Sequence, residues 1–253
     1  MNNKVAGKEG KYIYAVITTE EDRDYGEIGI DGERVYIIKD HQVGAVVSDI
    51  SNRKIRPERR HIAAHQAVLK RLMEENTPLP VSFGVIAEDA KEIRQFLSLN
   101  RNSFAEQLRR VQGKVEMGLR VALDVPNIFE YFVNTHDELR AARDLFLGGH
   151  RVPTQEDKIE LGRLFDRLLQ EDREEHTERV EVILSPCCFE IKRNPPRSEK
   201  EVMNLACLVE RKTIEKDFEA AIFEAARWFD NNFAIDFNGP WAPYHFVDVE
   251  LIS

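Results

Sequence analysis

The segment FNGPWAPYHF at residues 237–246 constrains the fold more than any other part of this chain. Its Asn-Gly pair tolerates a backbone with positive φ, and its two prolines fix φ at about −65° and remove two hydrogen-bond donors. The segment follows an amphipathic pattern and precedes a final β-like run. It therefore predicts a stiff turn that packs the large side chains of Trp241 and Tyr244.

The composition is that of a globular protein with room for two domains. The chain has 253 residues, of which 42% are apolar and 32% charged, so a fibrous or disordered chain is not indicated. The net charge of −9 argues against nucleic acid as a partner, because phosphate binding needs clustered Lys and Arg. The sequence shows neither a signal-peptide pattern nor an apolar run of about eighteen residues. We therefore expect a cytoplasmic protein that does not bind a lipid membrane.

The first part of the chain predicts an N-terminal mixed α+β domain over residues 1–112. β-like runs occur at residues 12–17, 35–38 and 43–47, followed by an amphipathic helix at 57–75, a strand-like LPVSFGVI run and a second helix at about 88–113. Gly84 interrupts the LPVSFGVI run. The second helical pattern weakens at Asn100-Arg101-Asn102, where we expect a break.

Residues 113–253 predict a C-terminal ferredoxin-like domain with the element order βαββαβ. The expected elements are a strand at 115–124, a helix at 127–147, strands at 180–191 and 202–210, a helix at 213–231 and a strand from Phe233. Residues 148–178 form a helical insertion, in which Thr154 is a candidate N-cap for a helix at 155–177, with Asp157 three residues on. The apolar stripe of this helix packs on its own domain or, alternatively, binds a partner; packing is the favoured interpretation.

The chain has three cysteines, Cys187, Cys188 and Cys207. An odd number without CxxC spacing predicts free thiols in a reducing compartment. The apolar residues change from even to odd positions at Pro186, which predicts a β-bulge there. If Ile191 pairs with Met203, Cys187 lies opposite Cys207 on the buried face, where both act as small apolar groups.

Two histidines of the first predicted helix, His61 and His65, are four residues apart and share one helical face. This spacing suits a metal pair, but a third ligand is not evident and Ile62 stands where an HExxH motif has its glutamate. We therefore expect packing or hydrogen bonding. Phosphate-binding loops, nucleophile elbows, kinase motifs and calcium loops are not found either. The sequence accordingly predicts no catalytic, cofactor-binding or metal-binding residues, and a protein that is not an enzyme.

Three motifs together resemble the GvpF/GvpL family of gas vesicle accessory proteins. They are Tyr12-Ile13-Tyr14-Ala15-Val16, then His65 with Leu79-Pro80-Val81-Ser82-Phe83-Gly84, and the closing GPWAPY. The family usually has LPVRFGT and GPWPPYxF, so this chain departs from the pattern at Ser82, Val85 and Ala242. Because of the departure at Ser82, no role of the family's arginine is carried over.

The resemblance implies an accessory or minor structural protein that binds the hydrophobic gas vesicle shell protein and assists nucleation and assembly. Its location would be the cytoplasm, in association with the gas vesicle, and other gas vesicle accessory proteins would be further partners. The motif residues with an expected structural role are His65, Pro80, Phe83, Gly84, Gly239, Pro240, Trp241, Pro243 and Tyr244. The alternative is a small-ligand-binding regulatory module, because ferredoxin-like sheets hold small effectors in many proteins.

Overall fold

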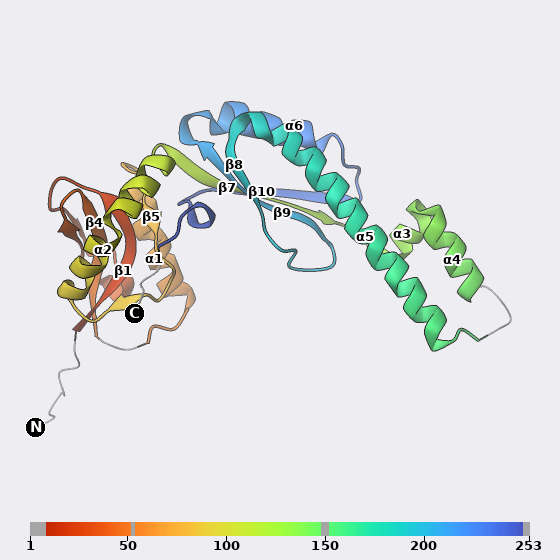
Figure 1. Cartoon of the computed structure of the whole chain (residues 1–253), viewed down its shortest axis with the longest axis horizontal. Helices are drawn as coiled ribbons and strands as arrows, with labels where there is room; N and C mark the ends of the chain where they lie inside the picture. Colours follow the sequence, from red (N-terminus) through yellow and green to blue (C-terminus); the bar gives the residue numbers. More distant parts are fainter. Residues whose placement is uncertain (1–8, 52–53, 148–151, 250–253) are drawn as a thin grey trace, which may run out of the picture. The chain divides into compact units, whose positions relative to one another are not determined.

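The computed structural model describes residues 9–51, 54–147 and 152–249 and divides the chain into two compact units (Figure 1). The first unit contains Met1–Glu116 together with Pro240–Ser253, and the second unit is Met117–Gly239. These units differ from the expected domains mainly at the C-terminus, because the last segment belongs with the first unit. Every helix within the described ranges is too short or too polar to span a bilayer.

The first unit contains a sheet with the strand order β2-β3-β4-β1-β5, and β6 also pairs with β1. The strands are β1 (Glu9–Thr18), β2 (Asp24–Gly26), β3 (Val35–Asp40), β4 (Val43–Ser51), β5 (Leu79–Pro80) and β6 (Ile86–Ala87). They confirm the β-like runs of the sequence. In β1 every side chain at positions 12–17 is at most 1% exposed. The strand is therefore buried on both faces, and its tyrosine hydroxyls need partners inside the protein.

The helices of the first unit are α1 (Arg59–Met73) and α2 (Ala90–Val111), with the 3-10 turns η1 (Ile30–Gly32) and η5 (Tyr244–Phe246). The predicted break at Asn100-Arg101-Asn102 is wrong, because α2 runs through it. The Asn100 amide donates to the Phe96 carbonyl at 3.0 Å, inside the helix. The rings of Phe96 and Phe104 also pack edge to face at 5.1 Å on the buried side of the same turns. Tertiary packing here outweighs the low helix propensity of asparagine.

The second unit contains a sheet with the strand order β10-β7-β9-β8. The strands are β7 (Lys114–Leu123), β8 (Cys188–Arg193), β9 (Glu201–Glu210) and β10 (Phe233–Trp241). The helices are α3 (Ile128–Thr135), α4 (Asp137–Leu147), α5 (Gln155–Leu184) and α6 (Glu219–Ala226), with short turns η2 (Ser185–Cys187), η3 (Arg211–Thr213) and the π-helical η4 (Ile214–Phe218). Figure 1 shows α5 and α6 on the same side of this sheet.

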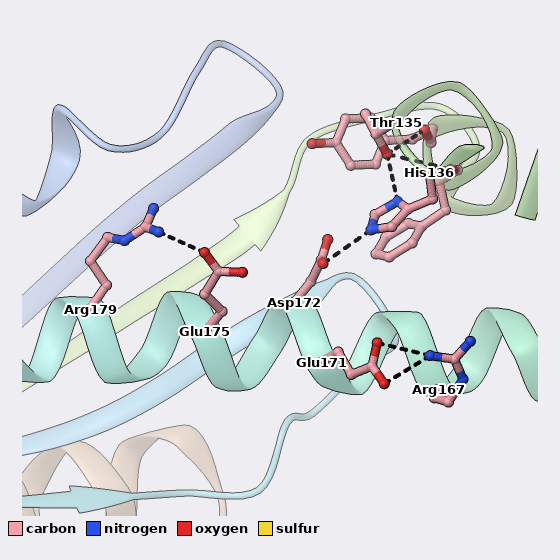
Figure 2. Close-up of polar contacts among 9 residues, drawn as sticks. Thr135, His136, Arg167, Glu171, Asp172, Glu175 and Arg179 are labelled. Carbon is pink, nitrogen blue, oxygen red and sulfur yellow. Dashed lines mark hydrogen bonds and ion pairs between the residues drawn. The ribbon is translucent and has the colours of Figure 1, made fainter. Parts of the chain in front are cut away.

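Two predicted helices of the second unit are divided or shortened. The helix expected at 127–147 is two helices, because His136 between them has an extended backbone with φ −119° and ψ 109°. The His136 ring stacks on Phe132 at 4.9 Å, and its Nε2 lies 3.1 Å from Asp172 Oδ1 on α5 (Figure 2). The helix expected at 213–231 has regular α geometry only in α6 and begins with η3 and η4.

The largest difference from the prediction is the length of α5. The helix continues to Leu184, so the strand expected at 180–191 starts only at Cys188. The β-bulge predicted at Pro186 is wrong, because this residue lies in the 3-10 turn η2. The apolar residues Val180, Val182 and Leu184 fit a strand of period two, yet Val182 is 73% exposed whereas the other two are at most 1% exposed. That pattern of burial is helical.

Polar pairs hold the charged middle of α5 in helical form. Figure 2 shows the pairs Arg167–Glu171 and Arg179–Glu175, each four residues apart. Their nitrogen–oxygen distances are 2.9 and 2.7 Å. Such pairs add about 0.2 to 0.5 kcal/mol each to a helix. At the start of α5 the predicted cap is confirmed as a capping box, in which Thr154 Oγ1 accepts from the Asp157 amide at 3.2 Å and Asp157 Oδ2 accepts from the Thr154 amide at 2.8 Å.

The apolar stripe of α5 packs within its own unit, as the favoured interpretation predicts. Its residues Leu161, Leu168 and Leu169 are buried. Phe165 contacts Phe129 and Phe132 of α3 in edge-to-face geometry, with ring centroids 5.6 and 5.4 Å apart. These contacts join the helical insertion to the helix that follows β7.

The register between β8 and β9 differs from the predicted one. Ile191 pairs with Cys207 instead of Met203, and Cys188 pairs with Val209. Cys187 precedes β8 and therefore does not lie opposite Cys207. The ladder instead continues past the strand end expected at Ile191, since the amide of residue 194 donates to the carbonyl of residue 204 at 2.7 Å. All three cysteines are free.

Candidate functional site

A buried histidine joins all three sequence motifs in the first unit. His65 lies on the inner face of α1 and is 1% exposed. Its Nδ1 is 2.9 Å from the Tyr12 hydroxyl on β1, and its Nε2 is 2.9 Å from the Tyr244 hydroxyl in η5. The backbone amide of Gly84, from the second motif, donates to the same Tyr12 hydroxyl at 3.1 Å. We call these four residues the His65 cluster.

The hydrogen bonds of the His65 cluster determine the imidazole tautomer. The Tyr12 oxygen accepts from Gly84, so its own proton is free to be donated to His65 Nδ1. The ring then carries its proton on Nε2 and donates it to the Tyr244 oxygen. The opposite tautomer would leave the buried Tyr12 proton without an acceptor. The cluster is therefore a directed chain from Gly84 through Tyr12 and His65 to Tyr244.

Burial keeps the whole cluster neutral. It lowers the pKa of His65 from its ordinary value of 6.5 to about 4. It also raises the pKa of Tyr12 and of Tyr244 above the ordinary value for a tyrosine. At neutral pH none of the three groups takes up or releases a proton easily. The arrangement suits a rigid cross-link, in contrast to a general acid or base, whose pKa lies near the working pH.

Aromatic rings surround the imidazole. Phe83 packs edge to face on His65 at 5.8 Å and on Tyr12 at 6.1 Å. Tyr14 lies 4.8 Å from Tyr12, and its hydroxyl is 2.9 Å from Ser48 Oγ. Such ring pairs contribute about 0.5 to 1.5 kcal/mol beyond the area they bury. The second motif thus supplies both a donor and a packing surface to the cluster.

The C-terminal segment, residues 240–249, is attached to the first unit by several further contacts. The carboxylate of Glu116, which is 5% exposed, accepts from the His245 backbone amide at 2.9 Å and contacts His245 Nδ1 at 2.6 Å. Gln107 on α2 makes two hydrogen bonds with the Asp248 backbone, at 3.0 and 2.7 Å. Phe246 is 1% exposed. The last motif therefore completes the core of the first unit.

The motif residues are placed in three ways. The cluster contains His65, Gly84 and Tyr244, and the Phe83 ring packs against it. Pro80 and Pro243 are buried nearby in the same unit, where Pro80 pairs with Ala15 of β1. Gly239, Pro240 and Trp241 form the end of β10, outside the cluster; Gly239 has φ +132° and Trp241 is 43% exposed. The packing expected for the Trp241 ring is thus only partial.

His61 makes hydrogen-bond contacts of its own, separate from those of His65. Its Nδ1 is 3.0 Å from the Arg56 carbonyl oxygen and its Nε2 is 3.1 Å from Asp31 Oδ1. Each ring nitrogen of both histidines thus contacts a protein group, which confirms the expected hydrogen-bonding role. Among the described residues, His, Cys, Asp and Glu side chains do not gather in threes around a metal position.

Sequence reasoning missed the role of Tyr12 and of Glu116. Tyr12 begins the apolar run 12–17 of β1, whereas Glu116 lies in β7 at an even position, like Lys114 and Arg120 of the same strand. A hydroxyl in an apolar run must find a buried partner, and that rule is the signal that could have identified Tyr12. The alternation in β7 gave no such signal for Glu116. Their partners could not be found this way, because they lie far away in the sequence.

Comparison with known proteins gives one consistent family. The family described as "Gas vesicle synthesis protein GvpL/GvpF" matches residues 10–248. Gas vesicle protein F of Haloferax mediterranei is 27% identical over 249 residues, which cover 95% of this chain and 94% of that protein. Gas vesicle protein F of a Streptomyces species is 27% identical over 242 residues, which cover 94% and 99%.

A solved structure has the same fold. The crystal structure of gas vesicle protein GvpF from Anabaena superposes with a TM-score of 0.83 at 22% identity, covering 96% of this chain and 99% of that chain. This similarity supports the mixed α+β fold with two sheets. Because the family match spans nearly all of the sequence, the chain belongs to the GvpL/GvpF family of gas vesicle proteins.

Proposed function

We propose that this chain is an accessory protein that binds the small, hydrophobic gas vesicle shell protein and assists nucleation and early growth of the vesicle. The observation that carries the proposal is the family match over residues 10–248, with relatives named gas vesicle protein F that align over nearly their whole length. In this proposal the protein stays in the cytoplasm, attached to the vesicle. Other gas vesicle accessory proteins are its further partners.

The surface of the second unit supports a role that works through contact. β8 is an edge strand of its sheet, and Phe189 on it is 62% exposed. On and after α6, Phe223 is 65% exposed and Trp228 is 57% exposed. Exposed large apolar side chains and an unpaired strand edge are features by which a folded protein covers an apolar partner.

We also propose a ferredoxin-like domain for the second unit, with the helical insertion at about 148–178. The order β10-β7-β9-β8 supports it. Helices connect β7 to β8 and β9 to β10, and in each of these pairs one other strand lies between the two, as in the ferredoxin-like plan. We place the domain boundary at residues 112–113, where Gly113 has φ +74° and the chain leaves α2 for β7. For the nine motif residues we propose structural roles, which the contacts of the His65 cluster support.

Co-expression with the shell protein tests the proposed function. The expected result is co-purification and a smaller pelleted fraction of the shell protein. Phe223→Glu should weaken both effects, whereas Leu99→Glu on α2 is the matched control, because Leu99 is also an exposed helical residue, at 76%. If the shell protein neither co-purifies nor pellets less in the presence of the unaltered chain, the proposal is wrong.

One observation bears on a ligand-binding module, although it lies in the first unit and not on the ferredoxin-like sheet where the sequence placed the ligand. The first unit has a hollow of about 430 Å³, within the range of small-molecule sites, and polar side chains such as Thr18, Glu20, Asn76 and Arg109 line it. A thermal-shift screen with nucleotides, amino acids and metals tests this function. A ligand at a hundred times its Kd stabilises by about 2.7 kcal/mol. A reproducible shift that Arg109→Ala abolishes would support the alternative.

A further inference from the structure

The three cysteines of the chain gather where α5 passes into β8. Cys187 Sγ and Cys188 Sγ are 4.0 Å apart, and the Cys187 thiol donates to the Leu184 carbonyl at 3.1 Å. The Cys207 thiol on β9 lies close enough to raise the pKa of the Cys188 thiol. Cys207 is fully buried, whereas the other two are half-buried. Cys188 therefore lies between two other sulfur atoms.

The strand register explains why Cys188 reaches Cys207. Cys188 pairs with Val209, two residues beyond Cys207, and Cys207 pairs with Ile191. In an antiparallel pair, residues two positions apart share a face, so the two cysteines are diagonal neighbours on one face of the sheet. Diagonal Cα atoms are about 7 to 8 Å apart, at or beyond the limit of about 7 Å for a disulfide, so the bridge requires a small backbone shift that brings the two strands closer. The irregularity between Cys188 and Glu190 adds local twist, which changes this separation.

We propose that Cys188 and Cys207 form a reversible disulfide on exposure to a peroxide, which joins the edge strand β8 to β9. In the first step one thiol sulfur attacks hydrogen peroxide, gains one oxygen as a sulfenic acid, and a water molecule leaves. In the second step the other thiol sulfur displaces that oxygen, which leaves as a second water. The sum is two thiols and one peroxide giving one disulfide and two waters.

The order of the two steps follows from exposure. Cys188 is half-buried and can meet the peroxide, whereas Cys207 is fully buried and acts as the resolving thiol. Cys187 is the weaker candidate for the bridge to Cys207, because it precedes β8 and its thiol donates to the carbonyl of Leu184, the last residue of α5. The resulting bond would hold the outermost strand of the sheet, which has a partner strand on one side only.

The acidity of these thiols sets the conditions under which the reaction runs. Burial raises the pKa of the Cys187 thiol to about 12, and the neighbouring Cys207 thiol together with burial raises the pKa of Cys188. Since the thiolate is the reactive form, oxidation is slow at neutral pH and becomes faster at alkaline pH. The reduced form is thus the resting state in a reducing compartment.

The experiment is peptide mapping of the full chain after treatment with hydrogen peroxide at pH 8.5, with trypsin and mass spectrometry under non-reducing conditions. Trypsin places Cys187 and Cys188 in one peptide, residues 180–192, and Cys207 in another, residues 201–211. We expect a cross-link between these peptides in the monomer, loss of two of the three free thiols, and full reversal by dithiothreitol. Cys187→Ser should keep the cross-link, whereas Cys188→Ala and Cys207→Ala should abolish it.

Circular dichroism of each variant before oxidation shows whether it is folded. If Cys207→Ala does not fold, the comparison of Cys187→Ser with Cys188→Ala decides, because both substituted residues are half-buried. The proposal is overturned by a bridge between the two neighbouring cysteines, by a bridge that needs Cys187, by bridges between chains only, or by three thiols that survive the treatment.

Discussion

The Nε2 atom of His65 lies 2.9 Å from the hydroxyl oxygen of Tyr244, although 179 positions separate the two residues. Through this bond the C-terminal segment is attached to α1, and the first unit contains both ends of the described chain. The other ring nitrogen bonds to Tyr12, so the imidazole has no free polar atom. Removing either hydroxyl therefore leaves a buried group without a partner.

Tyr244→Phe should lower the free energy of unfolding by about 1 to 3 kcal/mol, because the buried His65 N–H then lacks an acceptor. Urea unfolding at pH 7 measures the change. The control is Tyr25→Phe, since the half-buried Tyr25 ring faces Arg23 at 5.3 Å and Phe keeps that contact. We expect the control to stay within about 0.5 kcal/mol of the unaltered chain. Equal effects of the two substitutions would contradict the role of the Tyr244 hydroxyl.

The stability of the first unit should fall as the pH drops from about 6.5 to about 4. Unfolded His65 binds a proton near its ordinary pKa of 6.5, whereas the folded ring stays neutral down to about 4. Over this window the unfolded state holds one more proton, so acidification favours unfolding. The neutral His65 ring contributes its full share of the free energy of unfolding above pH 6.5. This share is about 3 kcal/mol, because each pKa unit corresponds to about 1.36 kcal/mol.

Urea unfolding at half-unit steps from pH 7 to pH 5 checks this pH dependence. This range is chosen because it lies above the pH at which most carboxylates titrate. His65→Gln should flatten the slope in this range. His41→Asn is the control, because His41 is an exposed histidine whose φ of +56° asparagine tolerates. A His65→Gln chain with the slope of the unaltered chain would show that another group binds the proton.

Gly84→Ala should destabilise the first unit by about 1 kcal/mol or more, because Gly84 has φ +92° and presents its amide to Tyr12 in that conformation. A Cβ there would meet no atom within 4 Å, so any cost arises from the backbone and not from a clash. Gly162 in α5 has equally open space but helical geometry, so Gly162→Ala should stabilise by about 0.5 to 1 kcal/mol. Calorimetry of both variants measures the two signs. A neutral Gly84→Ala would mean that this turn is not fixed.

Local patterns predicted the first unit well, apart from the break expected in α2, because residue type indicates its strands and helical spacing indicates its helices. In β1, β3 and β4 the β-branched and aromatic residues indicate strands, and the buried face of α1 has helical spacing. The contacts of His65 were not predictable in this way. Periodicity places a residue on a face, whereas Tyr12 and Tyr244 come from elements at opposite ends of the chain.

The second unit was harder to predict, because short apolar runs fit two periods. Apolar residues at alternate positions, as at Val180, Val182 and Leu184, can belong to a strand or to about one and a half turns of a helix. Only packing decides between the two. The β8–β9 register likewise depends on which residues close the hairpin, which the loop composition did not reveal. The end of α5 accounts for the first error alone, since the length of the helix sets where β8 begins.

Paired substitutions at the end of α5 distinguish the helix from the strand that the sequence favoured. Val180 is 1% exposed and Val182 is 73% exposed. In a strand both would lie on one buried face, so lysine at either position would be equally costly. In the helix, Val180→Lys should cost about 3 to 5 kcal/mol as a buried, unpaired charge, whereas Val182→Lys should stay within about 0.5 kcal/mol. Urea unfolding followed by far-UV circular dichroism measures both, and equal losses would contradict a helix that continues to Leu184.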